Sequence, residues 1–520
     1  MNGRRPHKWV IAGTVLTGTV MAVLDSSIVN VALPDMSGTL GATIEEITWV
    51  VTGYILANVI IMPIIGLLSA RFGRKRFYIA NVVLFTAASM LCGVARTLPL
   101  MVAFRVLQGI GGGVLITVSQ AILRESFPAS EQGVAMGIYG MGVVLAPAIG
   151  PTLGGWLTDQ YSWPWIFYIN VPVGILCVTL IARFIEDPPY LVRERGRLDV
   201  SGLALMTVGL GALQLLLEKG EQKDWFESRL IVTLAAVAAV GLALFVWREL
   251  TAKRPAVDLR LMRNVSFSSA TMLGGVLGMG LYGTLFLLPL FLQRLLGFPA
   301  MDSGLALMPR SLAMAVVMPV SGRLYNRLGP RLLVASGLLV SAFSFYQLSH
   351  LTLDMGAWDL FWPQVWQGVG FGLIFVALST AALATIERPK MTAAAGLYNV
   401  VRQVFGSVGI AVAATQLTAN ATRFRASLSE HVTAFDDATR QWLSSAMAGV
   451  GGAASAAGDA GSRALALLDL HVTREAMNLA YGRAFVLVAI LFVAALPLAL
   501  FLPARSEGTD AEGETTAAEA

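Results

Sequence analysis

The chain has 520 residues, of which 56% are hydrophobic and only 13% are charged. Soluble domains carry about 25% charged residues, so this composition excludes an ordinary water-soluble protein. The formal net charge of +5 does not indicate nucleic-acid binding, because the basic residues stand in short clusters between long apolar segments. A lipid bilayer is therefore the expected environment of most of the chain.

Fourteen segments are long and apolar enough to cross a bilayer, which takes about 20 helical residues. The sequence therefore predicts an all-α integral membrane protein. The first segment is too long for a signal-peptide core and is expected to be retained as a helix. The predicted spans are residues 9–33, 47–70, 77–95, 98–123, 134–158, 160–182, 200–217, 230–247, 266–292, 303–322, 332–350, 360–386, 391–418 and 484–503.

The basic residues predict how the chain lies in the membrane. Most of the 37 lysines and arginines fall before the first span, after the last one, or in even-numbered loops. Cytoplasmic loops are enriched in Lys and Arg, so both termini are predicted to face the cytoplasm. The short odd-numbered loops hold only Arg96, Lys219, Lys223, Arg229 and Arg294.

Motifs of the first half return in the second half at a nearly constant offset. Gly66–Lys75 returns at Gly322–Arg331, 256 positions later, and Arg105–Gly111 returns at Gln364–Gly370, 259 positions later. A repeat of this length in a hydrophobic chain is typical of transporters built from two related helical bundles. Helices 1–6 then correspond to helices 9–14, and helices 7 and 8 form an inserted hairpin.

This repeat divides the chain into four predicted regions. Residues 1–185 form a six-helix bundle, and residues 186–263 hold a cytoplasmic linker with the inserted helices, of which Asp199 caps the first. Residues 264–503 form the second bundle, with a polar external segment at 419–483. In that segment, helices are expected over Thr422–Leu443 and Ser462–Leu479. The acidic tail at 504–520 is expected to be disordered.

Four predicted spans each contain a single charged residue: Asp25, Arg105, Arg310 and Arg402. An ionised side chain at membrane depth costs at least about 2.5–3.5 kcal/mol on insertion scales, so it needs a partner or a wet cavity. These charges either form structural pairs that fix helix packing or serve function. The functional interpretation is favoured for Asp25 and Arg105, and the structural one for Arg310 and Arg402.

Asp25 is the only acidic residue inside any predicted span, so it is the best candidate for a proton carrier. Arg105 would stabilise the carboxylate if it came close, because a cation favours the charged form. We therefore expect alternation, with Asp25 paired or solvated in one state and buried and protonated in another. No metal-ligand cluster, nucleophile–base pair or nucleotide loop is visible, so neither an enzyme nor a cofactor is expected, and protons are the coupling ion.

Two further motifs concern helix packing. Ala146, Gly150 and Gly154 form a small-residue stripe on the fifth span, which allows close approach of another helix. Pro147 and Pro151 are expected to kink that span. The repeated basic turn after helices 2 and 10 is expected to hold the bundles together at the cytoplasmic face. Its residues are Gly66, Arg71, Gly73, Arg74, Gly322, Arg327 and Gly329.

These motifs together resemble the major facilitator superfamily, and within it the fourteen-span drug/proton antiporters of the EmrB/QacA type. Leu24–Pro34, with Asn30 and Pro34, is similar to the helix 1 motif of that family. The basic turn departs from its pattern, because Ala70 stands where an Asp is usual. The segment after helix 7 is similar to the EmrB branch. The remaining matches are the helix 4 motif (Arg105, Gln108, Gly109) and the antiporter motif (Pro147, Gly150, Pro151, Gly154, Gly155).

The resemblance implies a bacterial inner-membrane protein that exports hydrophobic or amphipathic drugs by alternating access, in exchange for protons. It also implies a periplasmic adaptor and an outer-membrane channel as partners, with 419–483 as the docking segment. A dedicated exporter of a metabolite, siderophore or fatty acid fits the motifs almost as well, and a channel is the alternative from another class. The predicted substrate cavity comprises Tyr54, Asn58, Gln120, Tyr282, Phe286, Asn399, Arg402 and Gln403.

Overall fold

The computed structural model describes residues 7–188, 199–252, 255–356, 358–433, 435–451 and 457–503, and these residues form helices and connecting turns without a strand. Thirteen helices among them are long and apolar enough to cross a membrane. One of these, α13 (Ala300–Leu348), is broken at Gly329, whose φ of 76° and ψ of 161° are not helical. Counting α13 as two spans gives the fourteen that the sequence predicts.

The N-terminal bundle contains the predicted helices 1–6. Helix 2 is divided by a short 3₁₀ turn, Met62–Ile64, at Pro63. Because proline lacks the N–H that a helix interior needs, it interrupts regular hydrogen bonding there. The helices are α1 (Lys8–Leu40), α2 (Ile44–Ile47), α3 (Trp49–Ile61), α4 (Ile65–Phe72), α5 (Arg74–Val94), α6 (Leu98–Ser126), α7 (Ala129–Gln160), α8 (Trp165–Tyr168) and α9 (Asn170–Phe184).

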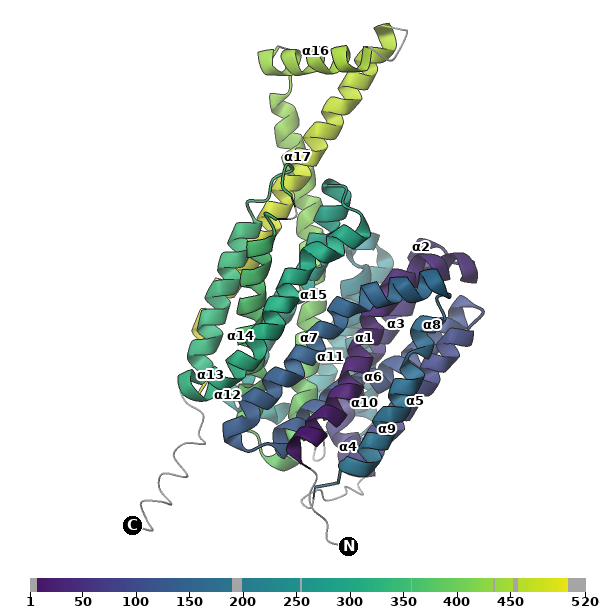
Figure 1. The fold of residues 1–520 in the computed structure, drawn as a ribbon, viewed down its shortest axis with the longest axis vertical. Coiled ribbons are helices and arrows are strands. Elements are labelled where there is room, and N and C mark those ends of the chain that lie inside the picture. The colour runs from purple at the N-terminus through teal and green to yellow at the C-terminus, as the bar shows by residue number, and fades with distance from the viewer. Residues whose placement is uncertain are drawn as a thin grey trace.

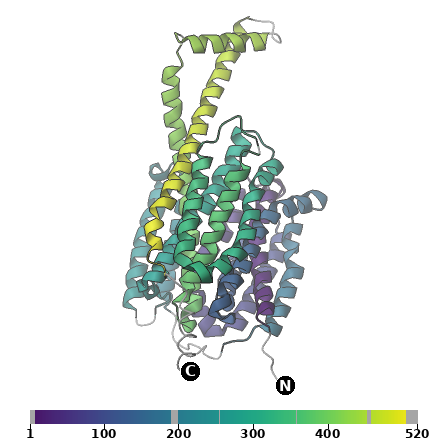
Figure 2. The ribbon, with the colours of Figure 1, turned by 60° about the vertical axis from the view of Figure 1, so that its left-hand side comes forward.

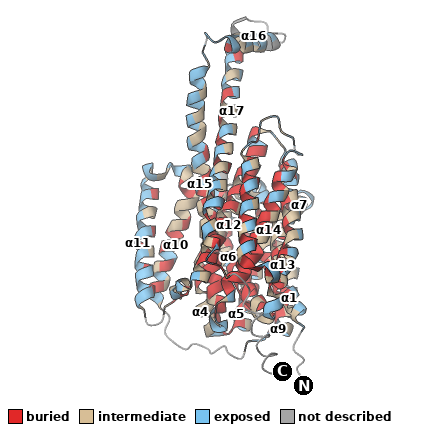
Figure 3. Cartoon of the chain, turned by 90° about the vertical axis from the view of Figure 1, so that its left-hand side faces the viewer, coloured by how far each residue is buried: buried red, intermediate tan, exposed pale blue. Residues whose placement is uncertain are grey.

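The C-terminal bundle lies beside the first one (Figure 1). Its α12 ends in a π-helical turn, Phe291–Leu295, just after Pro289. Buried residues gather in α6, α12 and α14 at the centre of the molecule, as Figure 3 shows. The helices of this bundle are α12 (Val265–Leu290), α13, α14 (Phe361–Ala384), α15 (Met391–His431), α17 (Ala457–Ala494) and α18 (Leu496–Ala499).

The inserted hairpin, α10 (Val200–Lys219) and α11 (Arg229–Thr251), packs along both bundles. Its α10 contacts α3 on one side and α15 on the other. The predicted cap is confirmed, because the Asp199 carboxylate accepts a hydrogen bond from the Gly202 N–H at 3.0 Å. At the other end of α10, Glu218 accepts a hydrogen bond from Thr52, and Trp225 donates one to Thr415. The hairpin therefore touches both bundles at that end.

A helical arm projects beyond the bundles at one end of the molecule (Figures 1 and 2). It consists of the last turns of α15, the crossing helix α16 (Asp437–Gly451) and the first part of α17. The single helix expected over Thr422–Leu443 is wrong, because the chain breaks after His431. Asp436 starts a new helix there by accepting hydrogen bonds from the N–H and hydroxyl of Thr439. We call this end of the molecule the arm end.

The described contacts between the bundles gather at the opposite end. Gly133 of α7 and Gly322 of α13 lie backbone against backbone, so a side chain on either would collide with the other helix. A Cβ on Gly66 would lie 2.6 Å from the Cβ of Ala393 in the other bundle. Asn326 also donates a hydrogen bond across this seam to the carbonyl of Ser130. The bundles are therefore closed together at the end away from the arm.

The predicted linker residues 189–198, residues 452–456 of the external segment and the tail at 504–520 lie outside the described residues.

Candidate functional site

An ion pair lies inside the N-terminal bundle at membrane depth. The Oδ2 of Asp25 on α1 and the Nη1 of Arg105 on α6 are 2.6 Å apart. Both residues are almost fully buried, with 1% and 0% exposure respectively. A buried ion pair is stable only when its remaining polar atoms are also bonded. The sequence therefore identified the two residues, and the structure shows them in direct contact.

Gln108 bridges the two charged groups from one turn further along α6. Its Oε1 accepts a hydrogen bond from Nη1 of Arg105 at 2.7 Å. Its Nε2 donates one to Oδ1 of Asp25 at 2.8 Å. Positions three apart on a helix lie on the same face, which explains why Arg105 and Gln108 occur with this spacing. The predicted helix 4 motif is thus a single hydrogen-bonding unit around Asp25.

Arg105 has two further partners that fix its orientation. Its Nε donates a hydrogen bond to the carbonyl of Val50 at 3.1 Å. Its guanidinium lies over the ring of Tyr54, 4.3 Å from the ring centroid. The Tyr54 hydroxyl in turn donates to the carbonyl of Ala22 on α1. Tyr54 was predicted in the substrate cavity, and the structure places its ring against the guanidinium of Arg105.

Asn170 is a site residue that the sequence reasoning missed. Its Nδ2 donates hydrogen bonds to Oδ1 of Asp25 at 2.7 Å and to the hydroxyl of Ser89 at 3.0 Å. Ser89 donates onward to the carbonyl of Phe167. A lone asparagine in the otherwise apolar sixth span was the available signal. The carboxylate of Asp25 therefore has partners from α6 and α9, and its burial leaves it no bulk water in this conformation.

The C-terminal bundle repeats this arrangement without the acid. Thr284 lies 259 positions after Asp25, and Gln367 lies 259 positions after Gln108. The Nε2 of Gln367 donates to the Thr284 hydroxyl at 3.4 Å. Arg310 of α13 donates to Oε1 of Gln367 at 3.4 Å. Arg105 is replaced by Gln364, so this half keeps a polar centre but holds no carboxylate there.

A second polar group lies where the bundles meet. Asn399 of α15 donates to Oε1 of Gln120 on α6 at 2.6 Å, which links the two bundles. Arg402 donates to Oδ1 of Asn399 at 3.0 Å. Nearby on the same helix, Gln403 accepts a hydrogen bond from the Tyr282 hydroxyl at 3.1 Å. Five of the eight predicted cavity residues are therefore brought together.

The other two predicted cavity residues lie in separate surroundings. Asn58 is buried and donates to the carbonyl of Tyr54, and its Oδ1 has no hydrogen-bond partner. Phe286 is partly buried and packs against the hydrophobic core. Neither makes a hydrogen bond with Asn399 or Arg402.

The antiporter-motif glycines join α7 to α1. A Cβ on Gly150 would collide with the hydroxyl of Ser27, and one on Gly154 would lie 2.7 Å from a side-chain carbon of Ile28. Gly155 faces an open position near Val31. The described helix runs through Pro147 and Pro151 from Ala129 to Gln160. The small-residue stripe thus brings α7 against the helix that carries Asp25.

The remaining motif residues lie apart from the Asp25 centre, at the surface, in turns or in another ion pair. Asn30 and Pro34 are exposed, on α1 beyond Asp25 toward the arm end. Gly73 has a φ of 85° and Gly329 a φ of 76°, so both repeats turn at a residue that must be glycine. Arg74 forms an ion pair with Glu125 within the N-terminal bundle. Arg327 is exposed.

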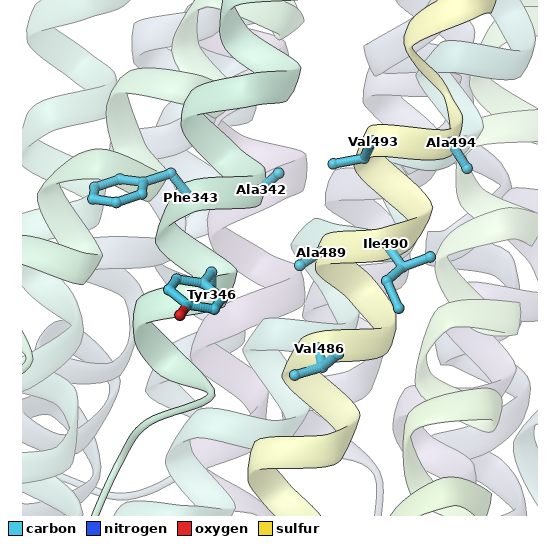
Figure 4. A pocket seen from close by; sticks show the side chains of 8 residues that line it. All are labelled: Ala342, Phe343, Tyr346, Val486, Ala489, Ile490, Val493 and Ala494. Carbon is cyan, nitrogen blue, oxygen red and sulfur yellow. The ribbon is translucent and has the colours of Figure 1, made fainter.

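A groove of about 530 Å³ lies on the outer face of the C-terminal bundle, away from these polar groups. Its lining residues come from the second half of α13 and from α17, which run side by side there (Figure 4). The Tyr346 hydroxyl is the one side-chain polar group in its lining, so the groove offers no group for proton coupling. Its lining residues are Ala342, Phe343, Tyr346, Val486, Ala489, Ile490, Val493 and Ala494.

Two repeated helical bundles with an ion pair buried inside the first one define a membrane transporter of the secondary type. The model of the Major Facilitator Superfamily matches residues 15–410, so the chain belongs to that superfamily. It is accordingly a multi-pass membrane transporter and not an enzyme.

Relatives of the chain are bacterial transport and resistance proteins. It is 36% identical over 481 residues to the fatty acid resistance protein FarB of Neisseria gonorrhoeae, covering 92% of both chains. It is also 36% identical over 421 residues to the multidrug export protein EmrB of Escherichia coli, covering 80% of this chain and 82% of that one.

A solved structure confirms the fold at lower sequence identity. The human organic anion transporter MFSD10 aligns with a TM-score of 0.61 at 13% identity, covering 95% of this chain and 100% of that one. At this identity the likeness concerns the fold only.

Proposed function

We propose that this protein is a proton-coupled exporter of hydrophobic or amphipathic compounds that works by alternating access. The observation that carries the proposal is the Asp25 centre, a single carboxylate held by Arg105, Gln108 and Asn170 inside the membrane. Protonating Asp25 would weaken its pairing with Arg105, because the neutral acid no longer attracts the cation. A proton can thereby change the packing of α1, the helix that the antiporter motif joins to α7.

The energetics suit export against a gradient. One unit charge that moves through 100 mV gains about 2.3 kcal/mol. At about 1.4 kcal/mol per tenfold, one proton per cycle sustains a substrate gradient of roughly fiftyfold. No nucleotide hydrolysis is then needed.

We propose the orientation from charge and packing together. The basic turns at Arg71 and Arg327 lie at the closed end, and Lys and Arg are enriched on the cytoplasmic side. The closed end then faces the cytoplasm and the arm end faces outward. In this conformation the bundles would be ready to release substrate to the outside, with the Asp25–Arg105 pair intact. The membrane would be the bacterial inner membrane, because FarB and EmrB are bacterial.

The test of coupling uses inverted membrane vesicles and an Asp25→Asn variant, which keeps the shape of the side chain and removes its charge. Respiration-driven uptake of a fluorescent dye should be lost in D25N and in wild-type vesicles treated with an uncoupler. An Asp302→Asn variant is the control, because Asp302 is an exposed acid in the first turn of α13. Uptake by D25N at the wild-type rate would contradict the proposal, and so would wild-type uptake that survives the uncoupler.

A dedicated fatty-acid exporter is the second candidate, and the 92% coverage of a fatty acid resistance protein favours it. Resistance profiling of a hypersensitive bacterial host with dyes, detergents, antibiotics and fatty acids separates the two. Protection against fatty acids only supports the dedicated exporter, and protection across several classes supports the multidrug exporter. A channel would let substrate equilibrate without building a gradient, which the vesicle assay detects.

We also propose that the arm docks a periplasmic adaptor joined to an outer-membrane channel. Its crossing helix α16 stands clear of the bundles (Figure 2), and Phe435 just before it is 90% exposed. Replacing residues 432–461 by a short Gly-Ser linker should abolish resistance of intact cells and leave uptake into inverted vesicles unchanged. Full resistance with the shortened arm would contradict the docking role.

A further inference from the structure

Helices α12 to α15 of the C-terminal bundle carry two arginines at membrane depth and, among their described residues, no acid at that depth. Arg310 and Arg402 lie within α13 and α15, while α12 and α14 hold no charged residue. The acid of α13, Asp302, lies in its first turn and is exposed. Neither arginine forms an ion pair with a described carboxylate. In the N-terminal bundle, by contrast, Asp25 neutralises Arg105.

This distribution leaves net positive charge beside the seam of the two bundles. Low-dielectric walls strengthen the field of a charge inside a cavity and attract ions of opposite sign. An unpaired cation at this depth also raises the free energy of the empty transporter. An anion that enters the seam offsets that cost, whereas a cation increases it.

Arg402 is the arginine placed to meet such an anion. It is half-buried rather than enclosed, and its partner Asn399 bonds to Gln120 across the seam. Its guanidinium lies 5.5 Å from the ring centroid of Phe375 and 6.0 Å from that of Tyr398. A Cβ on Gly140 of α7 would lie 2.9 Å from Phe375, so the other bundle contacts this ring as well. A fixed cation flanked by aromatic rings suits a molecule with one charged and one apolar end.

The backbone around Arg402 is held firmly. Gly278 of α12 approaches so closely that a side chain there would collide with the Arg402 carbonyl. One Arg402 nitrogen is occupied by Asn399, and a guanidinium has five N–H donors in all. The remaining donors can form the paired hydrogen bonds that guanidinium makes with carboxylate or sulfate groups.

We infer that Arg402 binds the negatively charged head group of an amphipathic substrate, with Phe375 and Tyr398 packing against the part of the molecule next to it. This inference rests on the proposed export function and names the substrate class of its central site. The head group is a carboxylate or a sulfate, and the remainder is an alkyl or aromatic body.

The charge of the substrate also changes how much charge each transport cycle moves across the membrane. If one proton enters per cycle, export of a neutral molecule moves one charge, while export of a monovalent anion moves two in the same electrical direction. At 100 mV one charge supports a gradient of roughly fiftyfold and two charges support roughly two-thousandfold. Efflux of an anion should therefore respond more steeply to membrane potential than efflux of a neutral compound.

The test compares two substrates with the same alkyl chain, dodecanoate and dodecyltrimethylammonium, below their micellar concentrations in proteoliposomes with an imposed proton gradient. Arg402→Gln keeps hydrogen-bonding ability and removes the charge, and Arg402→Lys keeps the charge without the paired donors. Arg425→Gln is the control, because Arg425 lies exposed on the arm and pairs with Asp469. R402Q should raise the apparent KM for dodecanoate at least tenfold without raising that for dodecyltrimethylammonium. R402K should fall between, and R425Q should match the wild type.

The outcomes separate this inference from the proposed function. If R402Q impairs both substrates equally, Arg402 has a structural role and the inference is overturned. If the wild-type protein exports dodecyltrimethylammonium but not dodecanoate, the inference fails while export stands. If the wild type exports neither these nor the dyes of the vesicle assay, the proposed function itself fails.

Discussion

The pairing of Asp25 with Arg105 makes a quantitative prediction about stability that is separate from transport. Replacing Asp25 by Asn removes the negative charge from a position that is 1% exposed and leaves Arg105 buried without a counter-ion. Removing one partner of a buried ion pair costs about 3–5 kcal/mol, because the other charge stays desolvated and uncompensated. We therefore expect D25N to lower the free energy of unfolding by about that amount.

The C-terminal bundle indicates which double substitution should restore the stability that D25N loses. At the repeated positions in the C-terminal bundle, Thr284 stands for Asp25 and Gln364 stands for Arg105, so that half folds without an ion pair at these two positions. A D25T/R105Q double variant should therefore recover most of the stability that D25N loses, while it stays inactive in proton-driven transport. Neutral replacement of a whole buried pair is often close to neutral for stability.

The measurement is denaturant unfolding of the purified proteins in one detergent, alongside dye uptake into inverted vesicles. The difference between the double variant and the sum of its single variants gives the coupling energy of the pair. If D25N unfolds at the wild-type denaturant concentration, the pair contributes nothing and the reasoning is refuted. If the double variant transports, the acid is not the coupling group.

Three other predictions test different parts of the structure. Gly322→Val should stop transport, because its side chain would collide with Gly133 and hold the closed end apart. In a Ser130→Cys background, this variant should make the cysteine react faster with an impermeant maleimide in inverted vesicles. Gly304→Val is the control and should behave as wild type, because nothing lies within 4 Å of that position. Asp199 pairs with Arg248 and caps α10, which lowers its pKa to about 2. Because the pKa is depressed in the folded state, its charge stabilises the fold above about pH 4, and this contribution is lost as the pH falls toward 2. An Asp199→Asn variant should thus be less stable than the wild type at pH 7 by denaturant unfolding, and the gap should shrink at pH 3; a gap that does not change with pH would refute this role. The Lys223–Glu45 pair is exposed and screened by solvent, so Lys223→Ala should leave the unfolding midpoint nearly unchanged, and a clear loss of stability would contradict its surface placement.

The membrane spans were readable from the sequence because the bilayer imposes one simple rule. Each crossing needs about 20 apolar residues, and backbone groups must bond within the helix. The break in α13 was also predictable, because the repeat aligned Gly329 with Gly73 and both turn with a positive φ. The arm was predicted less well. Its apolar periodicity continues through residues 432–436, and only the hydrogen bonds of Asp436 with Thr439 show that a new helix starts there.

The residues of the candidate site also divide into those that the sequence predicted and those that it did not. Asp25, Arg105 and Gln108 were evident because a charge inside an apolar span is rare and expensive. Asn170 was missed because an uncharged polar residue in a span stands out less in the sequence than a charged one. The contact of Tyr54 with Arg105 was not predicted, because the sequence does not tell which face of α3 meets α6.

What the sequence determined by itself is the membrane class, the span count, the repeat and the family, since each follows from local composition or from motifs that can be compared along the chain. The tertiary structure decided which charges are neutralised. Asp25 and Arg105 lie 80 positions apart and meet only because α1 and α6 pack together, whereas Arg402 meets no acid. Pairing across helices depends on how each helix is rotated about its axis, and one-dimensional spacing does not fix that rotation.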